Sequence, residues 1–103
     1  MKRASTLFSA LLLSFLLAAC GTVGKNFDHT NVSKIKNSVT TQMEILDWFG
    51  VPYKEGEENN HIMWTYQFDK WSAFEDTRSK DLVLLFDEKN KVRAHRFTTN
   101  MPE

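Results

Sequence analysis

The side chain in this sequence that is best placed to do chemistry is its single cysteine, Cys20. A cysteine sulfur is an intrinsically strong nucleophile, and this one stands at the end of an almost wholly apolar run, Leu7–Ala19. Lys2 and Arg3 give the chain a positive start ahead of that run. The run is shorter than the roughly 20 residues that a membrane-spanning helix needs. These features predict that residues 1–19 are a secretory signal peptide, which is removed.

The segment Leu17-Ala18-Ala19-Cys20 resembles the lipobox of bacterial lipoproteins. The resemblance implies that the sulfur of Cys20 takes a diacylglyceryl group and that Cys20 becomes the first residue of the mature chain. Two or more acyl chains hold a protein stably on a membrane, whereas a single chain does not. Gly21 follows, in place of the aspartate that resembles an inner-membrane retention signal, which favours the periplasmic face of the outer membrane. The alternative is an ordinary secreted protein with a free cysteine.

The composition restricts the other kinds of function. The 13 basic and 13 acidic residues cancel, so there is no overall basic field to attract nucleic acid. With its one cysteine assigned to lipid, the chain can form neither an internal disulfide nor a cysteine metal site. His29, His61 and His95 lack the spacing of metal ligands, and the 4 glycines form no phosphate-binding loop. We therefore expect a protein that is not an enzyme, with no cofactor and no bound metal.

The clearest element of the expected domain is a helix over Gln42–Phe49. Thr41 and Glu44 fit a capping box, in which the two side chains satisfy free backbone N–H groups at the start of the helix. Gly50 and Pro52 predict where the helix ends. Its apolar residues predict one stripe, formed by Met43, Ile45, Leu46 and Phe49.

Three strands are predicted after a charged turn at residues 54–60. Ile62–Phe68 alternates apolar and polar residues, and Leu82–Phe86 is apolar on both faces, as in a central strand. A tight turn at Asp87–Asn90 leads into Lys91–Thr98. In that strand Val92 and Ala94 should point one way and Phe97 the other, and this change of phase indicates a β-bulge. A further short helix is expected from residue 30 or 31 to residue 36. The sequence thus predicts an α+β fold with two short helices packed on one face of a three-stranded antiparallel sheet, an ααβββ two-layer sandwich.

Several short segments occur in a fixed order along the chain: Asn31–Ile35, Val39-Thr40, Phe49–Pro52, Trp64–Phe68 and Leu84–Asp87. Together they resemble the SmpA/OmlA (BamE-like) family of outer-membrane lipoproteins. The resemblance covers about residues 27–97, and Ser38 stands where the family usually has a glycine. It implies an acylated tether at residues 20–28 and a BamE-like domain at residues 29–103. The implied function is non-catalytic support of envelope or outer-membrane β-barrel protein assembly, with the β-barrel assembly machine as the candidate partner.

Two features are candidates for binding an envelope protein. Trp71 and Phe74 lie in a long expected loop, residues 69–80, and both are residue types that are common at interfaces. The same two aromatic side chains could instead fold back to cover the small core. Val83 and Leu85 should face away from the helices and leave apolar surface for a partner.

Arg93 and Arg96 lie on the last expected strand, at an edge of the sheet. Charges on an edge strand either bind headgroups or prevent edge-to-edge aggregation. The alternative function is a small periplasmic binding or inhibitor module with a β-lactamase-inhibitor-like fold. The sequence leaves the partner and the oligomeric state open.

Overall fold

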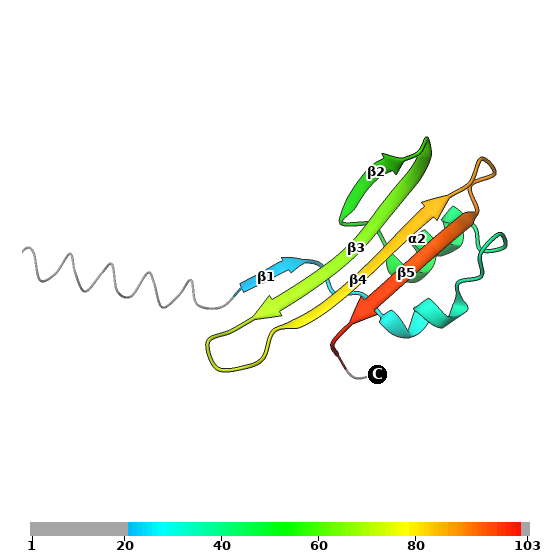
Figure 1. Cartoon of the computed structure of the whole chain (residues 1–103). Helices are drawn as coiled ribbons and strands as arrows, with labels where there is room; N and C mark the ends of the chain where they lie inside the picture. The colour runs from blue at the N-terminus through cyan, green and yellow to red at the C-terminus, as the bar shows by residue number, and fades with distance from the viewer. Residues whose placement is uncertain (1–20, 102–103) are drawn as a thin grey trace, which may run out of the picture.

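The strands form one antiparallel sheet, and the two short helices lie on one side of it (Figure 1). The computed structural model describes residues 21–101, so the predicted signal peptide, Cys20 and the last two residues lie outside the described part. The elements are β1 (Gly21–Gly24), the 3-10 helix η1 (His29–Lys34), α2 (Gln42–Phe49), β2 (Lys54–Glu58), β3 (His61–Trp71), β4 (Arg78–Phe86) and β5 (Val92–Thr99). The strand order is β1-β3-β4-β5, and β2 pairs with the other half of β3.

The prediction of a three-stranded sheet with two packed helices is wrong, because the sheet has five strands. β1 pairs with the end of β3, from Gly21 opposite Trp71 to Gly24 opposite Phe68. This strand lies in the segment that the sequence predicts to be a tether. β2 pairs with the start of β3, where the sequence predicts a charged turn. All of its residues are exposed, so its sequence has no apolar alternation to mark it as a strand.

The turn between β2 and β3 explains why the charged segment folds back as a hairpin. Asn59 and Asn60 have positive φ angles of 52° and 67°. Two successive positive φ angles are the requirement of a type I′ turn, whose twist matches that of the paired strands, and asparagine tolerates them well. The turn therefore supplies the local signal that the side chains of β2 lack.

The helix α2 begins and ends at the predicted residues. The Thr41 hydroxyl accepts a hydrogen bond from the N–H of Glu44 at 3.1 Å, and the Glu44 carboxylate accepts one from the N–H of Thr41 at 3.1 Å. Ile45 and Phe49 are buried. Met43 is 75% exposed, however, so the predicted apolar stripe is wrong at that residue.

The first helix is a short 3-10 helix that begins and ends before the predicted residues. Its cap is Asp28, whose carboxylate accepts a hydrogen bond from the N–H of Thr30 at 3.0 Å. None of the residues of η1 is buried. The core side chains of this region instead come from Phe27, just before η1, and Ile35, just after it.

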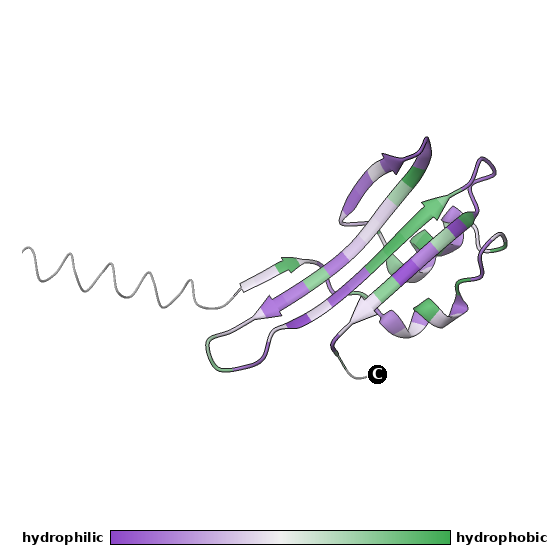
Figure 2. Cartoon of the chain, in the orientation of Figure 1, coloured by the Kyte–Doolittle hydropathy of each residue, from purple (hydrophilic) through white to green (hydrophobic). Residues whose placement is uncertain are grey.

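The core lies between α2 and one face of the sheet. It consists of Phe27, Ile35, Ile45, Phe49, Trp64, Tyr66, Leu82, Leu84, Phe86 and Val92. The hydrophobic residues of β4 gather in the half that leads to the β4–β5 turn, and the half next to the β3–β4 loop is polar (Figure 2). The sheet therefore continues beyond its apolar core, toward β1 and the β3–β4 loop (Figure 1).

β5 contains a β-bulge, as the sequence predicts, but the bulge separates Val92 from Ala94, so the prediction that these two residues point the same way is wrong. Leu85 pairs with Ala94 and Phe86 pairs with Val92, which leaves Arg93 as the extra residue. The bulge keeps Val92 fully buried while Ala94 turns to the opposite face. The turn at residues 87–90 that precedes it is also found as predicted.

Candidate functional site

The structure separates the predicted partner-binding residues into two surfaces. We call the first the loop end: Trp71, the last residue of β3, and the loop of residues 72–77 that carries Phe74. We call the second the outer sheet face: the side chains that point away from α2, among them Val83, Leu85 and Arg96. β4 begins beside the loop end, and Val83 and Leu85 lie in its second half, which leads to the β4–β5 turn. The loop end is therefore at one end of the sheet, and these apolar residues lie toward the opposite end (Figure 1).

The loop end lies where the chain enters the sheet. Gly21 follows Cys20 in the sequence, begins β1 and is the Cα partner of Trp71. The indole of Trp71 covers Gly21 so closely that a Cβ there would be 2.5 Å from Cζ2 of the ring. A residue with a Cβ at this position would therefore push the Trp71 ring away from β1. Cys20, the predicted lipidation site, lies outside the described residues.

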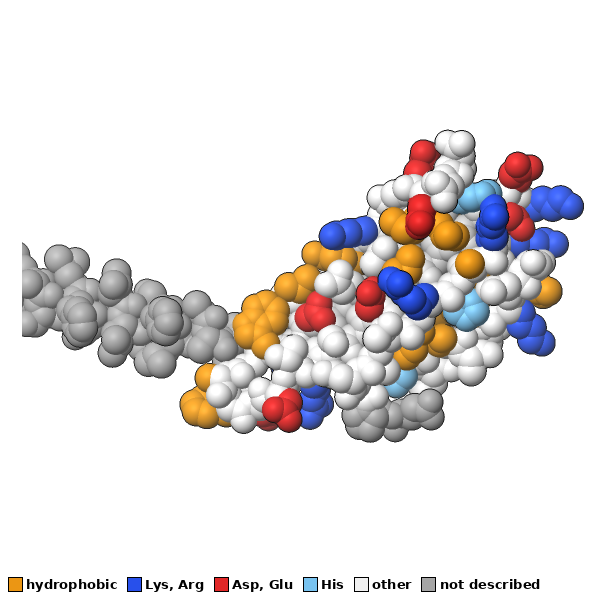
Figure 3. All heavy atoms as spheres, viewed as in Figure 1, with side chains coloured by type: hydrophobic (Ala, Val, Ile, Leu, Met, Phe, Trp, Pro, Cys, Tyr) orange, Lys and Arg blue, Asp and Glu red, His pale blue; other side chains and the backbone are white. Residues whose placement is uncertain are grey.

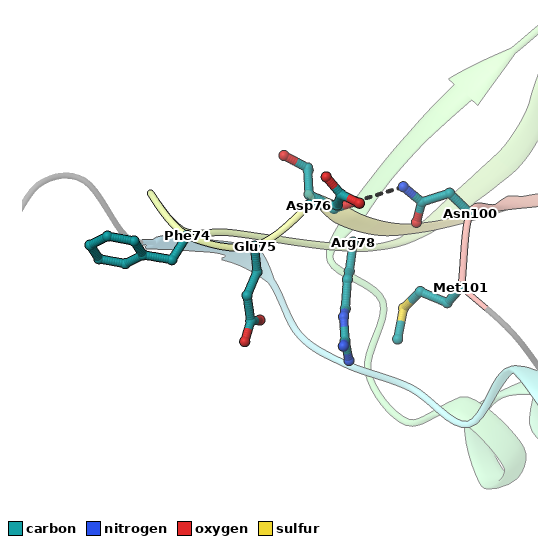
Figure 4. A pocket seen from close by; sticks show the side chains of 7 residues that line it. Phe74, Glu75, Asp76, Arg78, Asn100 and Met101 are labelled. Carbon is teal, nitrogen blue, oxygen red and sulfur yellow. Dashed lines mark hydrogen bonds between the residues drawn. The ribbon is translucent and has the colours of Figure 1, made fainter.

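The β3–β4 loop is shorter than the predicted segment of residues 69–80, because β3 and β4 continue into that segment from both sides. The hydroxyl of Ser72 accepts a hydrogen bond from the N–H of Glu75 at 3.1 Å. The amide of Asn100 donates to the carbonyl of Thr77 at 2.7 Å, as the dashed line in Figure 4 marks. This hydrogen bond connects the end of the loop to Asn100, the residue that follows β5.

Phe74 protrudes from this loop. Its side chain is 96% exposed, and its ring points away from Asn100 and Met101 (Figure 4). The loop borders an open hollow of about 780 Å³ lined by residues 74–78, Asn100 and Met101. Trp71 is 37% exposed and lies over β1. The expectation that the two aromatic side chains cover the core does not hold for Phe74.

The outer sheet face carries an apolar patch. Val83 and Leu85 alternate with the buried residues of β4 and are half-buried on the opposite face. The strand register places Met63 and Ala94 on either side of Leu85, and Arg96 beside Val83. Figure 3 views this face and shows hydrophobic side chains among charged ones. A shallow hollow of about 200 Å³ lies here, lined by Glu58, Val83, Leu85, Ala94, His95 and Arg96.

Arg93 and Arg96 both lie on the edge strand β5, but the bulge gives them different neighbours. Arg93 reaches across the end of β4, and its guanidinium donates a hydrogen bond to Nε2 of His61. A guanidinium can only donate, so this nitrogen of His61 is the acceptor. Arg96 lies beside the apolar patch instead. Only Arg96 is therefore placed to take part in binding at the patch.

Two polar groups of the inner face have structural roles. Nζ of Lys80 donates to Oδ1 of Asn26 and to the carbonyl oxygen of Phe27, both at 2.8 Å. Burial lowers the pKa of Lys80. Burial also raises the pKa of Tyr66 far above its usual value, and the phenol donates to the backbone carbonyl at the end of α2 at 2.7 Å. Through these hydrogen bonds, Lys80 holds the segment before η1 on the sheet, and Tyr66 holds the end of α2 on it.

In residues 21–101, no three His, Cys, Asp or Glu side chains lie close enough together to hold a metal ion. No helix in that same part of the chain has both the length and the hydropathy needed to cross a membrane. The features that stand out are two surfaces suited to noncovalent recognition.

Sequence reasoning missed two residues that shape these surfaces. Ala94 lies on the outer sheet face because the bulge is at Arg93, whereas the sequence pattern predicts that Ala94 shares the face of Val92. Gly21 lets the Trp71 ring lie directly on β1, and the signal for this in the sequence is a glycine directly after Cys20.

Comparison of the chain with models of protein families, with curated proteins and with solved structures found no match.

Proposed function

We propose that this protein is a non-catalytic lipoprotein, anchored through an acylated Cys20 to the periplasmic face of the outer membrane. Its domain binds an envelope protein through the outer sheet face and so supports envelope or outer-membrane protein assembly. Components of the β-barrel assembly machine are the candidate partners. The observation that carries the proposal is the apolar patch on the sheet face that α2 leaves uncovered.

The patch has the composition of a protein-binding surface. At its centre, Met63, Val83, Leu85 and Ala94 are neighbours across three strands. Arg96 and Glu58 border the shallow hollow beside them. An apolar centre with a charged rim is typical of interfaces, in which arginine is enriched. The helices contribute nothing to this face, so its apolar area stays in contact with water until a partner covers it.

The test is copurification from detergent-solubilised outer membranes. Ala94 is exposed within the patch, so Ala94→Glu places a charge there without disturbing the core. Val51 is 78% exposed outside both surfaces, and Val51→Glu is the matched control. We expect the wild type and Val51→Glu to capture envelope assembly proteins and Ala94→Glu to lose them, with equal melting temperatures for all three. Capture of the same proteins by both variants would contradict the proposed surface. Capture of a soluble hydrolase would favour the inhibitor function instead.

A further inference from the structure

The position where the chain enters the sheet determines which end of the domain meets the membrane. Gly21 is both the residue after Cys20 and the first residue of β1, opposite Trp71. Consecutive Cα atoms lie about 3.8 Å apart, and antiparallel partners lie about 4.5–5.5 Å apart. An acyl group on Cys20 is therefore attached within about 10 Å of the backbone of Trp71. No free tether separates such an anchor from the sheet.

The loop end has the side chains that a membrane interface favours. Trp71 is 37% exposed, and Phe74, three residues further on, is 96% exposed. Tryptophan is enriched at the level of the lipid headgroups, and a phenylalanine at the tip of a loop gains free energy when it leaves water for the acyl region. At 96% exposure, the Phe74 side chain adds nothing to the core and is free to enter an apolar phase.

The charged residues near the loop are also compatible with contact between the loop end and a membrane. Lys70 and Arg78 are partners across β3 and β4, so two cations flank the base of the loop. Their long side chains can reach phosphate groups while the aromatic rings lie deeper. Glu75 and Asp76 within the loop balance them. The loop end and the two cations that flank it together have no net charge, so attraction to a membrane must come mainly from the apolar side chains.

We infer that the loop end is a second membrane contact, in which Phe74 inserts into the lipid leaflet that holds the acyl chains of Cys20 and Trp71 lies at headgroup level. The inference rests on the acylation in the proposed function. The anchor keeps the loop at the surface, so insertion does not have to overcome the entropy of bringing the protein to the membrane. β3 has 11 residues, and at about 3.3 Å per residue its far end lies about 33 Å from the loop end. This orientation holds Val83 and Leu85, which lie toward the other end of the sheet, away from the membrane.

The experiment measures the depth of a fluorescent label in the acylated, full-length protein, reconstituted in vesicles of phosphatidylethanolamine and phosphatidylglycerol. Ala73→Cys places the label beside Phe74, while acylation blocks the sulfur of Cys20. Glu88→Cys places the same label in the β4–β5 turn, at the opposite end of the sheet, as the matched control. We expect lipids with brominated acyl chains to quench the label at position 73 and not the label at position 88.

Two further measurements make the test specific. Adding Phe74→Asp to Ala73→Cys should abolish the quenching, and replacing phosphatidylglycerol by phosphatidylcholine should leave it unchanged, because the contact is apolar. Quenching that survives Phe74→Asp, or that requires phosphatidylglycerol, would overturn the inference. An unquenched label at position 73 on a chain that carries acyl groups by mass spectrometry would overturn it and leave the proposed function intact. A chain without acyl groups would overturn both.

Discussion

Replacing Phe27 by alanine should destabilise the domain severely, although this residue lies in the segment that the sequence predicts to be a tether. Its side chain is 7% exposed, and its ring packs edge-on against Phe49, Tyr66 and Phe97 at centroid distances of 5.9, 6.0 and 6.4 Å. Removal of a buried phenylalanine side chain costs about 3–5 kcal/mol. A domain of this size has about 4–12 kcal/mol of stability in total. Phe27→Ala therefore removes a large part of the free energy of unfolding.

Urea unfolding of the unacylated chain that begins at Gly21 measures the effect. With a slope of about 1–1.5 kcal/mol per molar urea, the midpoint for Phe27→Ala should fall by about 2 M or more. Phe74→Ala is the matched control, because it makes the same chemical change at a side chain that is 96% exposed. Phe27→Leu keeps most of the volume and should cost about 1.5 kcal/mol or less, so it gives a measurable transition if Phe27→Ala does not fold. Equal midpoints for Phe27→Ala and Phe74→Ala would refute the assignment of Phe27 to the core.

Three other predictions concern the backbone and pH. Gly50 has φ 82° and ψ −158°, a region almost restricted to glycine, so Gly50→Val should cost about 1–3 kcal/mol in urea unfolding, against about 0.5 kcal/mol for the exposed Asp47→Ala. Ser38 has a φ of 70°, so Ser38→Gly should raise the stability by about 0.5 kcal/mol, and a loss of stability would contradict the strain that we assign there. Burial lowers the pKa of His95, so the folded protein binds fewer protons than the unfolded chain, and its stability is complete above about pH 6.5 and falls as the pH drops through the folded pKa. Urea midpoints at about pH 7.5 and pH 5 should therefore differ less for His95→Gln than for the wild type, and equal differences would show that this ring does not cause the effect.

The parts of the fold that the sequence predicts are those with strong local signals. The bounds of α2 follow from the capping box of Thr41 and Glu44 and from Gly50, all within or beside the helix. The central strand β4 follows from its apolar residues, and the change of phase in β5 indicates that a bulge is present, although not that it separates Val92 from Ala94. Each of these signals lies within a few residues of the structure that it determines.

The two strands that the sequence does not predict, β1 and β2, lack an apolar pattern, and β1 also depends on a distant partner. β1 is a strand only because β3 continues as far as Trp71 and offers a free edge to Gly21–Gly24. β2 consists of charged residues and glycine, and its pairing follows from the positive φ angles of its turn, not from burial. Patterns of hydrophobicity detect side chains that are buried, whereas these strands are held by backbone hydrogen bonds.

In the candidate site, too, some features can be predicted from a local sequence signal and others cannot. Val83 and Leu85 could be assigned to the uncovered face because alternation along one strand is a local property. The separation of Trp71 and Phe74 from that face, and their position at the point where the chain leaves Cys20, depend on the pairing of β1 with β3. No pattern within either segment contains that information.

Acylation of Cys20 is the claim on which both the localisation and the membrane contact depend. The direct measurement is metabolic labelling of cells with an alkyne analogue of palmitate, with the wild type compared with Cys20→Ser. We expect label on a processed wild-type chain, and no label on a Cys20→Ser chain that keeps residues 1–19. Equal labelling of the two proteins, or an unlabelled wild type that is nevertheless processed, would contradict the account.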